Sequence, residues 1–191
     1  LPLYAQDEQG YDNLCHLVSR AHLERPLEFE PHVRLTDLDG HTGGLIAFSG
    51  ASEGALTKLL AEGQQSHAEI LLQKLQELFP ERLYIELARR GNEVEERAEA
   101  ALVELAYDRD LPLVATNPAN FAEPHMHKAH DAMLCIAGST HIDADERAKS
   151  NPESYVKTYH MMDEAFDDLP EAVQNTLVVA QRCAYAPPYR K

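Results

Sequence analysis

Apolar and polar positions along the chain form blocks that predict strands followed by helices. Four short apolar runs beside turn-forming residues are predicted as buried strands: 1–5, 44–49, 83–87 and 111–116. Apolar residues at helical spacing follow each run, as with Tyr11, Leu14 and Val18 after the first. This repetition, with nearly continuous apolar strands, predicts an α/β protein whose parallel sheet is covered on both faces.

The helical blocks carry their own boundary signals. Ser66-x-x-Glu69 and Asn92-x-x-Glu95 predict capped starts for two of the helices. A final helix is predicted to begin at Asp168-Leu-Pro-Glu and to pack through four residues: Val173, Leu177, Ala180 and Cys183. Before it, 140–154 is predicted as a polar surface loop and 155–158 as a short strand.

Composition restricts the class of protein. The 191 residues suffice for one domain, and the formal charge of −15 argues against a DNA-binding surface on this chain alone. Three widely spaced cysteines (Cys15, Cys135 and Cys183) predict buried thiols in a reducing compartment. There is no membrane-length apolar run or leader, and the first residue is Leu, so we expect a piece of a longer cytoplasmic protein.

The carboxyl ends of parallel strands are where ligands bind in such folds, so the residues just after each apolar run are the candidates. They are Gln6 and Asp7, Ser49 and Gly50, Glu86, Arg89 and Arg90, and 117–120. Only Asp7 and Glu86 are carboxylates, and the guanidinium of Arg90 repels cations, which argues against a multi-metal centre. The acidic cluster of Glu95, Glu96 and Glu99 is interpreted as a solvated helix face, and no catalytic triad is evident.

A second candidate is the stretch PHMHKAHD at 124–131. His125, His127, His130 and Asp131 have the ligand chemistry of a zinc or manganese site. However, Pro124 suits the first turn of a helix, on which only His127 and His130 share a face. The alternative interpretation is that His130 and Asp131 serve packing and hydrogen bonding.

Six ordered blocks give a more specific signal. These are LYAQDEQGYDNLCHLVSRAHL, HTGGLIAFSGASEGALTKLL, RLYIELARRG, LPLVATNPANF, AHDAMLCIAGS and DLPEAVQNTLVVAQRC. Together they resemble the PHP (polymerase and histidinol phosphatase) domain in the alpha subunit of bacterial DNA polymerase III, in its alphaproteobacterial form. The resemblance covers almost the whole chain.

The resemblance implies a distorted (β/α)7 TIM-like barrel, of which 1–191 is a segment that begins after the family's first H-x-H strand. About 168–191 is expected to form an exit helix leading toward the polymerase core. Metal-competent members carry a His where this chain has Arg90, and an Asp-x-His where it has Pro118 and Asn120. Glu86 matches a family ligand position and is retained, and we expect Arg90 to pair with it.

The implied function is structural. The parent chain is expected to be the DNA-directed DNA polymerase of replication, a nucleotidyltransferase whose Mg-dependent active site lies outside this segment. The segment itself is expected to hold no cofactor, to brace the palm and thumb, and to help recruit a proofreading exonuclease subunit. Other parent domains would contact primer-template DNA, and no membrane is involved. The alternative is a metal-dependent phosphoesterase or 3′–5′ exonuclease, with metal ions generating hydroxide.

Overall fold

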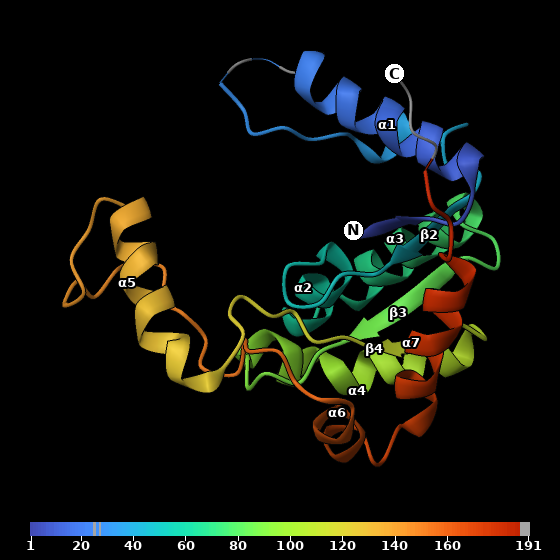
Figure 1. The fold of residues 1–191 in the computed structure, drawn as a ribbon. Coiled ribbons are helices and arrows are strands. Elements are labelled where there is room, and N and C mark those ends of the chain that lie inside the picture. Colours follow the sequence, from blue (N-terminus) through green and yellow to red (C-terminus); the bar gives the residue numbers. More distant parts are fainter. Residues whose placement is uncertain (25, 27, 188–191) are drawn as a thin grey trace.

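The computed structural model describes residues 1–24, 26 and 28–187. Within them, four strands form one sheet in the order β1-β2-β3-β4. The strands are β1 (Leu3–Ala5), β2 (Leu45–Phe48), β3 (Leu83–Leu87) and β4 (Leu113–Ala115). The helices are α1 (Glu8–Leu23), α2 (Ala55–Ala61), α3 (Gln65–Leu78), α4 (Glu93–Asp108), α5 (His127–Ala137), α6 (Tyr159–Ala165) and α7 (Pro170–Arg182). All four predicted strands and the mixed α/β class are therefore confirmed (Figure 1).

The sheet is not wholly parallel. β2, β3 and β4 run parallel, but β1 pairs with β2 in the antiparallel sense. The reason is the long return after α1, in which 28–44 brings the chain back beside the end of β1. There the amide of Gln6 donates to the carbonyl of Gly44 at 2.8 Å. Gly44 has a φ of 69°, in the left-handed region that suits glycine.

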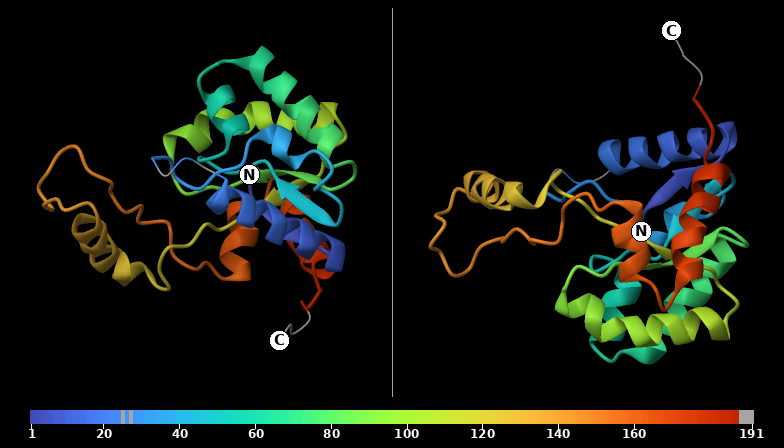
Figure 2. Two further views of the ribbon diagram at one scale, coloured as in Figure 1. Left: turned by 90° about the horizontal axis from the view of Figure 1, so that it is seen from above. Right: turned by 60° about the horizontal axis from the view of Figure 1, so that its bottom comes forward.

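The two faces of the sheet are both covered. One face contributes Leu45, Ala47, Leu83, Ile85 and Leu113 to a large apolar core shared with α2, α3 and α4. The opposite face carries a smaller cluster of Ile46, Phe48, Tyr84 and Val114, packed against Val179 of α7. Figure 2 places α3 and α4 on one side of the sheet and α7 on the other. The burial of β2, β3 and β4 on both faces explains why their sequences are nearly continuously apolar. β1 lies at the edge of the sheet with Tyr4 41% exposed, so the expectation that this first strand is buried is wrong.

Two local expectations about the helices are wrong. α3 begins one residue before Ser66, with Gln64 as its N-cap and no side-chain cap bond, so the expected box with Glu69 does not form. On α7, Val173 is buried as expected, but Leu177 is 63% exposed and Ala180 is exposed. α7 lies beside the short edge strand β4, so only part of the helix is covered. The predicted strand at 155–158 is reduced to a single bridge between Phe121 and Tyr155.

That bridge closes the base of an extension that we call the arm, residues 122–153. The arm consists of a 3₁₀ turn (Pro124–Met126), α5 and the irregular loop that returns to Ser154. Both views of Figure 2, like Figure 1, show α5 and this loop standing away from the sheet and its covering helices. The predicted polar loop is confirmed as irregular, although Ser150 and Ser154 within it are buried.

Candidate functional site

The carboxyl ends of β2, β3 and β4 are joined by hydrogen bonds around Glu86. The amide of Glu86 donates to the Ser49 hydroxyl at 2.9 Å, and the Thr116 hydroxyl donates to Oε1 of Glu86 at 2.6 Å. Glu86 is only 6% exposed, and no described residue hydrogen-bonds to its buried Oε2. The fold thus places one carboxylate among the carboxyl ends of β2, β3 and β4, which we call the sheet end.

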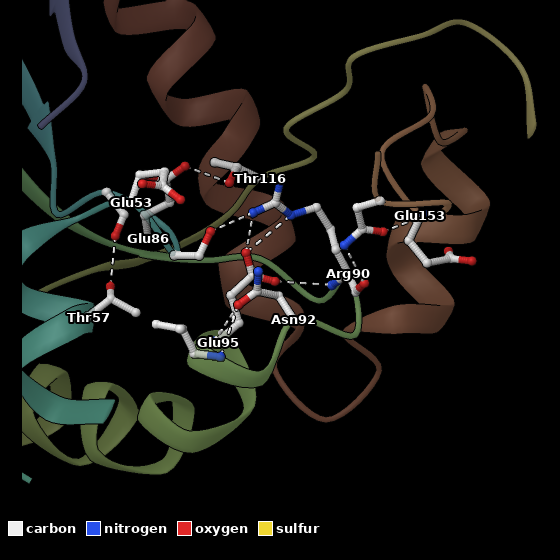
Figure 3. Close-up of polar contacts among 12 residues, drawn as sticks. Glu53, Thr57, Glu86, Arg90, Asn92, Glu95, Thr116 and Glu153 are labelled. Carbon is white, nitrogen blue, oxygen red and sulfur yellow. Dashed lines mark hydrogen bonds and ion pairs between the residues drawn. The ribbon is translucent and has the colours of Figure 1, made fainter. Parts of the chain in front are cut away.

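Arg90 occupies the loop after β3 and pairs with Glu95 of α4, not with Glu86 as expected. Its Nε donates to Oε1 of Glu95 at 3.1 Å, and Nη2 contacts the same oxygen. Nη2 also donates, at 2.9 Å, to the hydroxyl of Ser52, a residue that follows β2. Figure 3 shows the guanidinium directed at Glu95, with Glu86 turned toward Thr116. Because the side chains of Arg90 and Glu95 are 13% and 5% exposed, this is a largely buried charge-assisted pair.

The expectation that Glu95 belongs to a solvated face is therefore wrong, and its helix position gives the reason. Asn92 is the N-cap of α4, and its side chain accepts from the amide of Val94 at 2.9 Å. Glu95 lies three residues later, which turns its carboxylate back over the start of the helix. There it accepts from the backbone amide of Arg90 at 3.3 Å as well as from its guanidinium. The predicted cap is confirmed, but the carboxylate serves Arg90.

Arg89 forms the neighbouring bridge between α4 and the turn before α7. Its guanidinium donates to Glu99 and to Asp168, with 2.6 Å between Nη1 and Oδ1 of Asp168. It also lies 4.6 Å from the centre of the Phe166 ring. The hydrogen bond from Arg89 lowers the pKa of Asp168 below its ordinary value. Glu99, interpreted from the sequence as solvated, is part of this bridge.

The other two predicted pocket positions follow β4 and lie toward the arm. Pro118 is partly buried, and Asn120 is exposed. The backbone amide of Asn120 donates to the carbonyl of Ser154 at 2.8 Å, next to the bridge at the base of the arm. The structure therefore brings Glu86 and Arg90 to the ends of strands, whereas the side chain of Asn120 is turned out to solvent.

The histidine stretch forms a different kind of site within the arm. Ser150 lies between two of its rings, with His127 Nε2 at 3.0 Å from the Ser150 carbonyl and His130 Nδ1 at 2.7 Å from the Ser150 hydroxyl. The face shared by His127 and His130 is thus confirmed. His125 is apart from them, highly exposed and 3.0 Å from Glu123.

Asp131 adds the contacts that, together with those of His127 and His130, hold α5 against the returning loop. We call this set of contacts between α5 and Arg147 and Ser150 of the loop the clasp. Its two oxygens accept from Nη1 and Nη2 of Arg147, each at 2.8 Å, and Oδ1 also accepts from the amide of Ser150 at 2.9 Å. The hydrogen bonds from Arg147, then that from Ser150, hold the pKa of the Asp131 carboxyl well below its usual range. His130 and Asp131 are hydrogen-bonding residues, as the second interpretation of the sequence had it.

Neither site gathers a set of metal-binding side chains. Across 1–24, 26 and 28–187, no three His, Cys, Asp or Glu side chains lie close enough together to hold a metal ion. The thiols do not contribute either, since Cys15 is exposed, contrary to expectation, while Cys135 is buried and Cys183 partly so. No described helix is long and apolar enough to cross a membrane.

Sequence reasoning missed the partners that organise both sites: Ser52, Glu95, Arg147 and Ser150. One signal was available. Glu95 stands at the third position after a predicted N-cap, where a carboxylate turns back over the helix start. Arg147 is an arginine in a predicted polar loop near an aspartate-bearing helix. The distance along the chain between Arg147 and Asp131 leaves no periodic signal, so only the fold reveals that pair.

The chain is similar along most of its length to known proteins. Residues 1–90 match the PHP domain family. Over 185 residues, 97% of its length, the chain is 43% identical to the DNA polymerase III subunit alpha of Caulobacter vibrioides. It is also 36% identical to the Pseudomonas aeruginosa subunit and 35% identical to the Rickettsia bellii subunit, over 96% of its length in each case.

These matches confirm the predicted resemblance: residues 1–90 match the PHP domain model, and nearly the whole chain is similar to DNA polymerase III alpha subunits. The chain spans about a sixth of the length of the curated relatives it matches, 16% in the Caulobacter protein.

Proposed function

We propose that the chain is a PHP segment of a replicative DNA polymerase III alpha subunit, and that its sheet end is a structural junction without bound metal. The parent chain would carry out DNA-directed DNA synthesis in the cytoplasm with Mg²⁺ held outside this segment. This proposal rests on the similarity along the chain and on the residues at the strand ends.

The observation that carries the structural role is the buried pair of Arg90 and Glu95. The guanidinium of Arg90 links the segment after β2, the loop after β3 and the start of α4, as a cation bound between them would. The donor set does not fit a metal: Glu86 offers one free carboxylate oxygen, Pro118 has no donor atom in its side chain, and Asn120 is exposed. The fixed positive charge of Arg90, in the loop that follows the same strand, opposes cation binding.

The barrel form and the domain limits belong to the same proposal. A closed (β/α)7 barrel would need further strands beyond the four described, because here α7 packs through Val179 on the sheet face of Ile46, Phe48, Tyr84 and Val114 that would otherwise line its interior. In that arrangement 1–191 is one PHP segment and α7 leads toward the polymerase core. The palm and thumb of the parent chain and a proofreading exonuclease subunit would be its partners, while DNA would contact other, less acidic domains.

The test is the metal content of the purified full-length parent, measured together with phosphodiesterase activity on a substrate that the polymerase site does not use. We expect less than stoichiometric zinc or manganese and no chelator-sensitive hydrolysis. Stoichiometric metal with chelator-sensitive hydrolysis would establish the metal-dependent phosphoesterase instead.

A gain-of-function variant sharpens this test. Replacing Arg90→His, Pro118→Asp and Asn120→His together removes the cation and restores three donors at the positions that the family resemblance assigns to the pocket of Glu86. We expect the triple variant to bind manganese measurably by calorimetry where the parent does not. The matched control is the same triple variant with Glu86→Gln, in which the gain should be lost. Equal binding in the two triple variants would contradict the assignment of Glu86 to the pocket.

A further inference from the structure

The arm is built with its polar side inward and an apolar stripe outward. Its inner side is the clasp of Asp131, Arg147 and Ser150 described above. Its outer side carries Met126, Met133 and Ile136, which are 40%, 64% and 79% exposed. These residues recur at spacings of seven and three, so they lie along one face of the helical segment. The exposed residues Ala129 and Ala137 extend the same face.

This arrangement differs from that of the other helices. α2, α3 and α4 each bury an apolar face in the sheet core, as with Leu56, Leu72 and Leu102. α5 buries only Cys135, and Figures 1 and 2 show it standing away from the sheet and from the other helices. A contiguous apolar stripe on a projecting helix marks an interaction surface.

We infer that the outer face of the arm, formed by Met126 of the 3₁₀ turn and by Met133 and Ile136 of α5, docks onto another part of the same alpha-subunit chain, outside residues 1–191. This inference rests on the proposed function. The relatives that match 97% of this chain are about six times longer, so the arm is present in proteins with a large tethered surface available to cover it. A tethered surface has a high effective concentration, which favours it over a separate partner of equal affinity.

The loop that follows α5 carries charge that indicates the chemistry of the surface that covers the arm. Asp143, Asp145 and Glu146 are exposed in this loop, next in sequence to Ile142, which is 52% exposed. An arm with an apolar helix face and an acidic loop is complementary to an apolar patch with basic residues at its margin. The docking surface on the parent chain is therefore expected to combine aliphatic or aromatic residues with Lys or Arg.

The experiment compares variants of the full-length parent by amide hydrogen exchange across residues 127–137. In the unmodified parent, docking should protect α5. Met133→Glu combined with Ile136→Glu should accelerate its exchange on the order of a hundredfold, because burial of two large side chains is lost. Both side chains are exposed within 1–191, so the variant keeps the clasp, and unchanged exchange in α4 verifies folding.

The matched control places the same charges on exposed apolar positions outside the arm. Ile70 on α3 and Leu177 on α7 are 67% and 63% exposed, so Ile70→Glu with Leu177→Glu should leave exchange in α5 unchanged. Equal exchange in the unmodified parent and the arm variant would overturn the inference. So would protection that depends on parent concentration, which indicates a second copy, or protection that appears only with an added exonuclease subunit. A parent gene without polymerase sequence would instead refute the proposed function.

Discussion

The sheet end and the arm are both charged sites at which the sequence offers metal-ligand types, and both are organised by an arginine–carboxylate pair. They differ in what lies beneath the pair. Arg90 and Glu95 join segments that are packed on the main core, whereas Arg147 and Asp131 join one isolated helix to one loop. The same chemical pair therefore supports the global fold in one region and a local structure in the other.

This difference has a thermodynamic consequence. Loss of a contact in the cooperative body changes the free energy of global unfolding, whereas loss of a contact in a projecting unit changes only local opening. The comparison can be tested by breaking each pair in turn and asking which observable responds.

The largest effect is expected for Arg90→Met. This change leaves Glu95, which is 5% exposed, as a buried carboxylate without its cation, and removes the bond to Ser52. We expect a loss of about 3 kcal/mol in the free energy of unfolding, which corresponds to a fall in Tm of roughly 10 °C for a chain of this size. Denaturant unfolding monitored by circular dichroism measures it.

Two companion variants isolate the pair. Arg90→Lys keeps the charge but not the forked geometry, so it should lie between the parent and Arg90→Met. Adding Glu95→Gln to Arg90→Met should recover part of the lost stability, because the uncompensated charge is gone. No recovery in the double variant would argue that Arg90 acts by packing alone.

The second effect is expected for Asp131→Asn in the arm. The amide keeps the shape but loses the charge that draws Arg147 and the amide of Ser150. Cleavage of the 138–150 loop by a protease should rise about tenfold, while the global Tm should stay unchanged. The control is Asp143→Asn, an exposed residue of the same loop. A fall in Tm as large as that of Arg90→Met would remove the distinction between the two regions.

The structural features that were predictable from the sequence are those set by residues close together along the chain. The strands and most helices follow from periodicities within ten to twenty residues, and the cap at Asn92 from a four-residue signal. The antiparallel pairing of β1 was not predictable in this way, because the path of 28–44 decides it. The resemblance identified Glu86 and Arg90 as pocket positions, but the choice of Glu95 over Glu86 as partner depends on where α4 begins.

The arm is the region whose contacts the sequence predicts least well. PHMHKAHD has a composition that suits either a metal site or a clasp, and only the position of Ser150 and Arg147 distinguishes them. Those partners are 16 and 20 residues away along an irregular loop, where no periodicity relates them. The exposed stripe of Met133 and Ile136 was likewise hidden, because an apolar helical face usually indicates burial.

A smaller, pH-dependent effect follows from the lowered pKa of Asp131. A carboxyl whose pKa is lower when folded than when unfolded stabilises the folded form above its unfolded pKa, about 3.9, and this stabilisation is lost as the pH falls through the folded pKa. The clasp should therefore persist as the pH falls to about 4 and loosen only well below that value. Protease cleavage of the loop against pH measures this, and Asp131→Asn should lack the transition.

The smallest effects should distinguish the histidines from one another. His130→Gln removes an acceptor or donor for the Ser150 hydroxyl, which is buried, so the 138–150 loop should open two- to fivefold more often, roughly what one neutral hydrogen bond contributes. His125→Gln should change nothing, because that ring is highly exposed and its pairing with Glu123 lies at the surface. Exchange of the Ser150 amide measures both variants under identical conditions. If instead the arm bound zinc and both variants weakened that binding equally, His125 and His130 would be metal ligands. The arm would then be a metal site.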